Sequence, residues 1–157
     1  MMLSDLSDRY TLSGLLRKTS TAELYRGRRN SDGTAVVLKM LREEYPSPVD
    51  LARLRHEHSL LQSLQIPQVV RSLGLEQLGH RLALVLEDVG ETSLEMLVQS
   101  QRLELPRALE LAVALAHVVA CVHRHHIVHK DIRPHHFFLR GSSSHVVLID
   151  FGIATRL

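Results

Sequence analysis

The most informative stretch of this sequence reads His129-Lys130-Asp131-Ile132-Arg133-Pro134-His135-His136-Phe137-Phe138-Leu139. It surrounds one carboxylate, that of Asp131, with basic residues and ends in an apolar run that is typical of a short strand. A second apolar run, 146–149, leads into Asp150-Phe151-Gly152. This run delivers Asp150 to a turn, Phe151 returns to the core, and Gly152 permits the change of backbone direction. The sequence therefore predicts two aspartates, each in a loop beside a short strand.

Two such carboxylates, with a cation on the phosphates, are what phosphoryl transfer from ATP requires. Lys39 can supply the cation, since it follows the apolar strand residues Val36-Val37-Leu38. A charge at such a position is costly unless it is paired. Glu57 lies on the apolar stripe of the next predicted helix, so we expect a Lys39–Glu57 ion pair that holds the ammonium where the α- and β-phosphates arrive. The alternative is a surface lysine and a half-exposed glutamate that never meet.

The stretch 129–139 resembles the catalytic loop of protein kinases, H-R-D-L-K-P-x-N, followed by its short strand. The resemblance implies that Asp131 is the base for the substrate hydroxyl and that Arg133 contacts phosphate in place of the usual lysine. It also implies that Asp150 binds Mg²⁺ between the β- and γ-phosphates. His136 stands where the family has a metal-binding asparagine. An imidazole is a poor ligand for Mg²⁺, and Mn²⁺ would tolerate it better.

The same resemblance implies an ATP site. Residues 86–89 read as the hinge between two lobes, with main-chain groups of Glu87 and Val89 facing the adenine edge. The residues that correspond to the apolar contacts of the base are Leu24, Val37 and Phe138. The residues that correspond to the stacked spine of an active kinase are Leu61, His129 and Phe151. Each of these residues alone is better explained by ordinary core packing, and only their joint occurrence favours a kinase.

A closer resemblance covers the whole chain. Its motifs are Leu41-Arg42-x-Glu44-Tyr45-Pro46-Ser47, Arg53-Leu54-Arg55-His56-Glu57, Leu82-Ala83-Leu84-Val85-Leu86-Glu87-Asp88, Ile127-Val128-His129-Lys130-Asp131-Ile132 and Leu148-Ile149-Asp150-Phe151-Gly152-Ile153-Ala154-Thr155. They are similar to the N-terminal kinase domain of large bacterial hybrid signalling proteins, which join a Ser/Thr kinase domain to an AAA-type ATPase, a GAF domain and a sensor histidine kinase. The resemblance implies an ATP-dependent Ser/Thr kinase that uses Mg²⁺ or Mn²⁺, acts on a protein substrate and belongs to a longer chain.

Two further features depart from the kinase pattern. The loop that should be rich in glycine is Arg17-Lys18-Thr19-Ser20-Thr21-Ala22-Glu23 and contains none. Glycines let the amides of such a loop approach phosphates closely, so we expect Arg17, Lys18 or the hydroxyl groups of residues 19–21 to substitute at some loss of fit. The chain also stops at Leu157, before any activation segment or A-P-E-like motif. We expect a fragment of a longer chain or a truncated gene product.

Periodicity and turn residues predict an α+β fold of the protein-kinase type. Residues 1–9 are expected to form a tail, 10–89 an antiparallel β-sheet lobe with one main helix and a hinge at 87–90, and 91–157 the first helices and β-hairpin of a helical lobe. The predicted strands are 10–15, 23–29, 35–41, 69–75, 81–86, 137–139 and 146–149. The predicted helices are one from Pro48 to 66–67, capped by Ser47, and two at 93–100 and 106–123. Tight turns are predicted at 30–33 and 79–80, and a loop at 141–144.

The helix at 106–123 is the most apolar part of the chain. We expect Leu109, Val113, Ala116 and Ala120 on its buried stripe. In a chain of this length the face around Leu109, Val113 and Ala120 would lack its usual partners, so we also expect it to be exposed.

Composition excludes several classes of protein. With 45% hydrophobic and 23% charged residues the chain is of the soluble globular type, and a net charge of +2 without a basic run gives no support for nucleic-acid binding. The eleven histidines lack cysteine partners at zinc spacings, and Cys121 alone cannot form an internal disulfide. No N-terminal signal is recognisable. The longest apolar run, 108–122, contains Glu110 and His117 and is too short to span a bilayer, so we expect a cytoplasmic protein without a membrane segment.

Three functions remain open. An active protein kinase is favoured by the presence of Lys39, Glu57, Asp131 and Asp150. A pseudokinase-like module, which binds nucleotide or a partner without phosphate transfer, is favoured by the missing glycines and His136. A small-molecule phosphotransferase with a kinase-like fold is less favoured, because of the Asp-Phe-Gly turn and the hinge.

Overall fold

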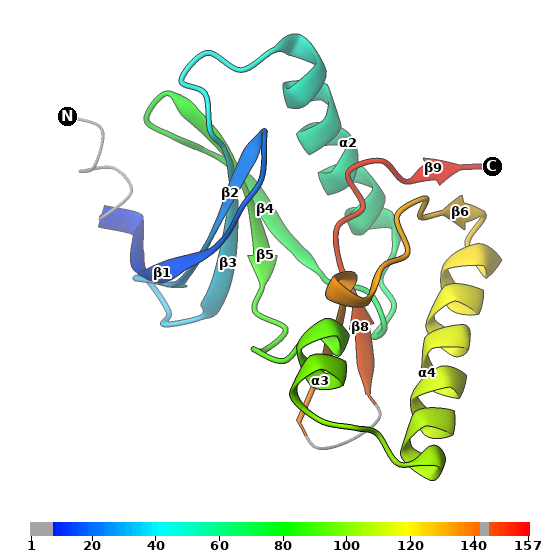
Figure 1. Cartoon of the computed structure of the whole chain (residues 1–157). Helices are drawn as coiled ribbons and strands as arrows, with labels where there is room; N and C mark the ends of the chain where they lie inside the picture. Colours follow the sequence, from blue (N-terminus) through cyan, green and yellow to red (C-terminus); the bar gives the residue numbers. More distant parts are fainter. Residues whose placement is uncertain (1–7, 142–144) are drawn as a thin grey trace. The chain divides into compact units, whose positions relative to one another are not determined.

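The computed structural model describes residues 8–141 and 145–157, which fall into two compact units (Figure 1). The first unit comprises the chain up to Ser59 together with Arg71–Asp88, and the second comprises Leu60–Val70 and Val89–Leu157. Most of the predicted tail and residues 142–144 of the predicted loop lie outside the described residues. Each unit is described below by itself.

The first unit is built on a five-stranded antiparallel sheet. Together with the helices α2 (Pro48–Ser63), α3 (Leu94–Ser100) and α4 (Leu105–Arg124), described in the following paragraphs, this sheet confirms the predicted α+β class. Its strands are β1 (Tyr10–Lys18), β2 (Ala22–Arg29), β3 (Ala35–Leu41), β4 (Ser72–Leu78) and β5 (Arg81–Glu87), in the order β1-β2-β3-β5-β4. One face of the sheet carries the core cluster of Tyr10, Val36, Leu38, Met40, Leu78, Ala83 and Val85. Because side chains alternate along a strand, Val37 and Lys39 point to the opposite face.

Two glycines determine how β1 to β3 fit together. Gly33 closes the β2–β3 turn with a φ of 70°, and its N–H donates to the carbonyl of Arg29 (2.8 Å), which confirms the hairpin predicted at 30–33. At Gly27 a Cβ atom would lie 2.6 Å from the carbonyl oxygen of Thr11. Only glycine therefore lets β1 approach β2 this closely.

The strand predicted at 69–75 is wrong in its limits, since β4 runs from Ser72 to Leu78. The strand continues up to the predicted turn at Gly79, whose φ is 60°, because β4 and β5 pair as a hairpin. Val69 instead forms a parallel bridge with Leu148 in the second unit, and the N–H of Val70 donates to the carbonyl of Leu148 (3.0 Å). The apolar run thus divides between two pairings, which its composition does not reveal.

Helix α2 spans Pro48–Ser63 and begins as predicted. The amide of Asp50 donates to Ser47 Oγ (3.1 Å), which satisfies a free N–H of the first turn. The predicted stripe is buried; its members are Leu54, Glu57, Leu61 and Leu64. The helix ends at Ser63, a little before the predicted limit at 66–67.

The second unit contains two helices and two small sheets. Its elements are α3 (Leu94–Ser100), α4 (Leu105–Arg124), β6 (Ile127–Val128), the 3₁₀ turn η1 (Pro134–His136), β7 (Phe137–Leu139), β8 (Val146–Leu148) and β9 (Thr155–Arg156). β6 pairs with β9, and β7 pairs with β8. The strand predicted at 146–149 ends at Leu148, because the opposite strand β7 begins at Phe137, the partner of Leu148. The amide of Ile149 still donates to the carbonyl of His136 (2.9 Å), which belongs to the 3₁₀ turn η1.

The buried stripe predicted for α4 is wrong. Its buried residues are Leu111, Val118, Cys121 and Val122. Leu109 and Val113 are 58% and 70% exposed, as expected for a face without partners. The helix is apolar on several sides, so its sequence does not say which side faces β6 and β8, the strands that it contacts.

Helix α4 is also longer than the apolar run identified in the sequence. With 20 residues and a mean hydropathy of 1.7 it is the one helix among the described residues that could cross a membrane by length and composition. The prediction that this segment is too short is therefore wrong. Its contacts with β6 and β8 are those of a helix in a folded domain.

Candidate active site

The first unit brings Lys39 and Glu57 together. Lys39 Nζ lies 2.7 Å from Glu57 Oε2, which confirms the predicted ion pair. The Glu57 side chain is 1% exposed and that of Lys39 is 15% exposed. Because side chains alternate along β3, Lys39 points away from the core cluster. Glu57, on the buried stripe of α2, lies next to the Lys39 ammonium group. The result is a nearly desolvated ammonium group, held at a fixed place by a charge-assisted hydrogen bond.

Two residues predicted to contact the adenine base lie on the same sheet face as Lys39. Leu24 is the cross-strand partner of Lys39, and Val37 precedes Lys39 by two positions on β3. Directly opposed residues and residues two apart share a face. The third predicted base contact, Phe138, belongs to β7 in the second unit.

The residues predicted as the hinge are fixed by charged groups. The amide of Glu87 donates to the carbonyl of Arg71 (3.0 Å), and its carboxylate accepts from the Arg71 amide (2.9 Å). The next residue, Asp88, pairs with Arg26: Nε lies 2.8 Å from Oδ2, and Nη2 donates to Oδ1 at 3.1 Å. Sequence reasoning missed this bidentate pair. Val89 is buried and belongs to the second unit.

The glycine-free loop between β1 and β2 forms a tight turn. Thr19 donates from its amide to the carbonyl of Ala22 (2.8 Å), and the amide of Ala22 donates to Thr19 Oγ1 (2.9 Å). Lys18 pairs with Glu23 at 3.1 Å, and Arg17 is exposed. Arg42, which sequence reasoning did not assign to the site, donates from Nη1 to the carbonyl of Thr19 (3.1 Å).

In the second unit Asp131 has partners on both its main chain and its side chain. Its amide donates to His129 Nδ1 (3.2 Å), and its Oδ1 lies 2.6 Å from Arg133 Nε. The neighbouring Lys130 has a φ of 68°. Left-handed backbone at a residue other than glycine is uncommon and occurs often at functional sites.

His129 supports this loop from the core. It donates from Nε2 to the carbonyl of Ile149 (2.9 Å), and its ring stands edge-on to Phe151 with centroids 4.6 Å apart. Burial lowers the pKa of His129 below its usual value. The ring is therefore neutral, with Nδ1 free to accept the amide of Asp131. Leu61, the third predicted spine residue, is buried in the same unit.

His136 joins the two aspartates. Its Nδ1 donates to the main-chain carbonyl of Asp131 (2.9 Å), and its Nε2 lies 3.4 Å from Asp150 Oδ2. Asp150 has a φ of 64°. The two loops predicted from the sequence thus meet at a buried imidazole.

This donor set fits a divalent cation in part. Asp150 offers a carboxylate oxygen and His136 an imidazole nitrogen, a pair that suits Mn²⁺ better than Mg²⁺. No group of three His, Cys, Asp or Glu side chains among the described residues could hold a metal ion. A metal here would need further ligands, such as phosphate oxygens. When bound, it would neutralise phosphate charge.

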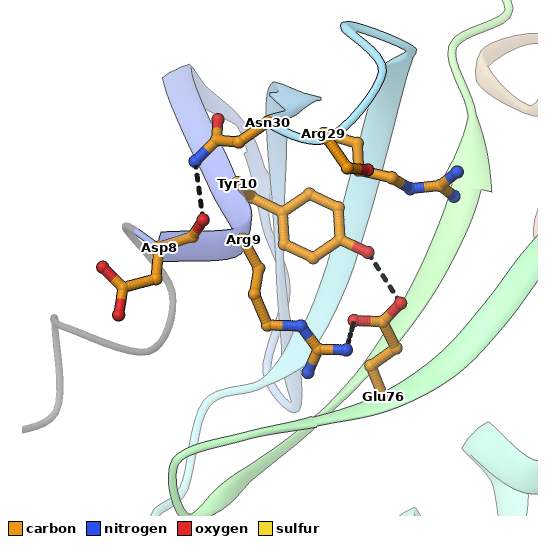
Figure 2. Close-up of a pocket in the computed structure, with 7 residues that line it drawn as sticks. Asp8, Arg9, Tyr10, Arg29, Asn30 and Glu76 are labelled. Atoms are coloured by element: carbon orange, nitrogen blue, oxygen red, sulfur yellow. Dashed lines mark hydrogen bonds and ion pairs between the residues drawn. The ribbon is translucent and has the colours of Figure 1, made fainter.

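A separate hollow of about 410 Å³ lies at one end of the sheet in the first unit. Figure 2 shows the Tyr10 ring in this hollow, with its hydroxyl and the Arg9 guanidinium both meeting Glu76. Tyr10 donates to Glu76 Oε1 (2.8 Å), and Arg9 Nη2 lies 2.9 Å from Oε2. Burial and the bond to Glu76 raise the pKa of Tyr10. These contacts join β1 to β4, the two outer strands of the sheet.

Comparison with known proteins finds relatives over nearly the whole chain. The chain is 31% identical over 152 residues to serine/threonine-protein kinase pkn2 of Myxococcus xanthus, with 95% of the chain and 18% of that protein covered. It is 32% identical over 162 residues to PkaB of Streptomyces coelicolor (98% and 38%), also a serine/threonine-protein kinase. It is 28% identical over 154 residues to the serine/threonine-protein kinase PrkC of Bacillus subtilis (97% and 24%). The chain therefore spans well under half the length of these relatives.

The family comparison covers nearly the whole chain. Residues 10–157 match the protein kinase domain, a range that includes Lys39, Asp131 and Asp150. The chain belongs to the protein kinase domain family.

Proposed function

We propose that the protein containing this chain is an ATP-dependent protein serine/threonine kinase. It transfers the γ-phosphate of ATP to a hydroxyl group of a protein substrate. The observation that carries the proposal is the Lys39–Glu57 pair, 2.7 Å apart with Glu57 1% exposed. Desolvating two charges is unfavourable, and apolar residues in their place are often as stable or more stable. A role in binding phosphates explains why the Lys39 ammonium group is nevertheless held in place on the sheet face that carries Leu24 and Val37.

In this proposal each residue has the role that the family resemblance implies. Lys39 contacts the α- and β-phosphates, while Leu24, Val37 and Phe138 contact the base beside the main chain of Glu87 and Val89. Asp131 accepts the proton of the substrate hydroxyl as the bond between that oxygen and the γ-phosphorus forms and the bond to the ADP oxygen breaks. Arg133 contacts phosphate. Asp150 and His136 hold the cation.

The alternative proposal is a pseudokinase-like module that binds nucleotide without transferring phosphate. It is supported by the 2.6 Å contact of Asp131 with Arg133. The guanidinium group occupies one of the two carboxylate oxygens, so that oxygen is not available to accept the proton of a substrate hydroxyl. His136 and the glycine-free loop support the same alternative.

Two measurements separate these proposals. Melting of the chain is recorded with ATP and either Mg²⁺ or Mn²⁺, and phosphate transfer is recorded for the full-length protein and its Asp131→Asn variant. A raised Tm with transfer that Asp131→Asn abolishes supports the kinase. A raised Tm without transfer supports the pseudokinase. No change in Tm with either metal contradicts both.

We also propose that the chain is part of a longer bacterial signalling protein in the cytoplasm. Support comes from its 18% and 38% coverage of the pkn2 and PkaB relatives, which leaves room for further domains, and from the intracellular supply of ATP. An AAA-type ATPase, a GAF domain and a sensor histidine kinase are the domains that the sequence resemblance implies. Reading the gene beyond Leu157 tests this: a stop codon there would contradict it.

A further inference from the structure

One arginine holds the tip of the glycine-free loop. Arg42 follows β3 and donates from Nη1 to the carbonyl oxygens of Thr19 (3.1 Å) and Ser20 (3.3 Å). Its main-chain amide donates to the carbonyl of Thr21 (2.9 Å). Three consecutive carbonyl groups of the loop therefore point toward one residue. We call this set of contacts the Arg42 latch.

The Arg42 latch determines where the loop amides point. In a trans peptide unit the N–H lies opposite the C=O, and the described residues contain no cis peptide. The amides of Ser20 and Thr21 therefore point away from Arg42. Within the described part of the chain neither amide donates a hydrogen bond, and both residues are exposed. Successive amides turned to one side form a concave site for anionic oxygen atoms.

Glu23 supports the latch from the base of the loop. Its Oε1 lies 3.1 Å from Lys18 Nζ and 3.9 Å from Arg42 Nε. Its Oε2 accepts from the Tyr25 hydroxyl (2.9 Å) and lies 3.5 Å from Arg81 Nη2. The hydrogen bond from Lys18 lowers the pKa of the Glu23 carboxyl most, followed by that from Tyr25. This ionised carboxylate balances cations that would otherwise repel one another around the loop.

We propose that Arg42 is a positioning residue for the nucleotide phosphates. It holds residues 19–21 so that the Ser20 and Thr21 amides face the phosphates of bound ATP. In a glycine-rich loop the amides can approach phosphates because side chains are absent. In this loop Arg42 instead holds the carbonyl groups, so that the amides face the opposite side. The loop precedes Leu24, the cross-strand partner of Lys39, within the same unit. The inference rests on the proposed ATP site, because the phosphates must lie beside Lys39.

Calorimetric titration with ATP and with adenosine tests this role, because adenosine has the same base and no phosphates. We expect Arg42→Ala to weaken ATP binding about tenfold, the effect of losing hydrogen bonds to a charged group, and to leave adenosine binding within about twofold. Arg42→Lys keeps a cationic donor and should recover part of the loss. Arg55→Ala is the matched control, since Arg55 is exposed on α2 and its side chain forms no hydrogen bond or ion pair within the described residues.

A second readout needs no variant. In NMR spectra of the wild-type protein, the amide resonances of Ser20 and Thr21 should shift with ATP and stay in place with adenosine. ATP binding without a shift at either amide would overturn the role of the latch and leave the ATP site intact. Equal losses of ATP and adenosine affinity in Arg42→Ala would do the same. A wild-type protein that binds neither ligand would overturn the ATP site itself, and the latch with it.

Discussion

His136 donates a hydrogen bond from Nδ1 to the main-chain carbonyl oxygen of Asp131, 2.9 Å away. A carbonyl can only accept, so Nδ1 carries a proton and Nε2 is the ring nitrogen that can act as a ligand. That atom lies 3.4 Å from Asp150 Oδ2, longer than the roughly 2.7–2.9 Å of a charge-assisted hydrogen bond. Two ligand atoms that share a divalent cation at roughly 2.1 Å lie about 3 Å apart. The distance between His136 Nε2 and Asp150 Oδ2 is therefore closer to that of two ligands of one metal ion than to that of a hydrogen bond.

Replacing His136 with asparagine should change the metal preference. An amide oxygen is a hard ligand that suits Mg²⁺, while the imidazole nitrogen suits Mn²⁺. We expect wild-type protein to bind ATP more tightly with Mn²⁺ than with Mg²⁺, and His136→Asn to reduce that ratio roughly tenfold. Calorimetric titration of ATP in each metal measures both affinities. His135→Asn, one position away, is the control and should keep the wild-type ratio; an unchanged ratio in His136→Asn would exclude the nitrogen ligand.

The Lys39–Glu57 pair should show strong coupling in a double-mutant cycle. Lys39→Met leaves a buried carboxylate without its partner and should lower the free energy of unfolding by about 3 kcal/mol. Lys39→Met/Glu57→Leu removes both charges and should recover most of that loss, while ATP binding stays absent. Urea denaturation of the wild type, both single variants and the double variant gives the coupling. Additive effects would mean that the two side chains do not interact in solution.

Buried His129 should make stability depend on pH. Its lowered pKa means that the unfolded chain, with an imidazole pKa of about 6.5, takes up a proton first as the pH falls. The contribution of His129 is therefore complete above about pH 6.5 and is lost as the pH falls through the lower pKa of the folded state. We expect the unfolding free energy of the wild type to decrease more steeply from about pH 7 to about pH 5 than that of His129→Asn.

The asparagine variant is chosen because its side-chain oxygen can still accept the amide of Asp131 without titrating. Urea denaturation at a series of pH values measures both slopes. Because the other ten histidines are common to both proteins, their contribution cancels in the difference. Parallel slopes would show that His129 is not the group responsible.

Tyr10→Phe should weaken the contact between β1 and β4. The variant loses the hydrogen bond to Glu76 and should cost about 1 kcal/mol of unfolding free energy. Tyr45→Phe changes the same group at a residue that is 84% exposed and should cost nothing measurable. ATP affinity should be equal in both variants, because the hollow lined by Tyr10 includes neither Lys39 nor the Arg42 latch. A reduced ATP affinity in Tyr10→Phe alone would link the hollow to the nucleotide site.

Local rules were enough for several parts of this fold. The turn at Gly33 and the start of α2 at Pro48 were predicted because each depends on neighbouring residues only. The Lys39–Glu57 pair was predicted because a charge that follows an apolar strand is costly to bury unless it is paired. Glu57 on the apolar stripe of α2 was the acidic residue placed to pair with it. The family motifs identified Asp131 and Asp150.

Contacts between distant residues were not predictable in the same way. Arg26 and Asp88 are 62 positions apart, and neither has a sequence signal that points to the other. The hold of Arg42 on residues 19 and 20 depends on the end of β3 lying beside the loop. The buried side of α4 depends on where β6 and β8 lie, since several sides of the helix are equally apolar.

The left-handed backbone at Asp150, with a φ of 64°, has a consequence for mutagenesis. Alanine at this position would lose the carboxylate and also strain the main chain, since Cβ-bearing residues other than Asn and Asp rarely adopt this conformation. Any lost activity would then combine two causes. Asparagine tolerates the conformation and removes only the charge. The difference between Asp150→Asn and Asp150→Ala would therefore separate the cost of the turn from the chemistry of the carboxylate.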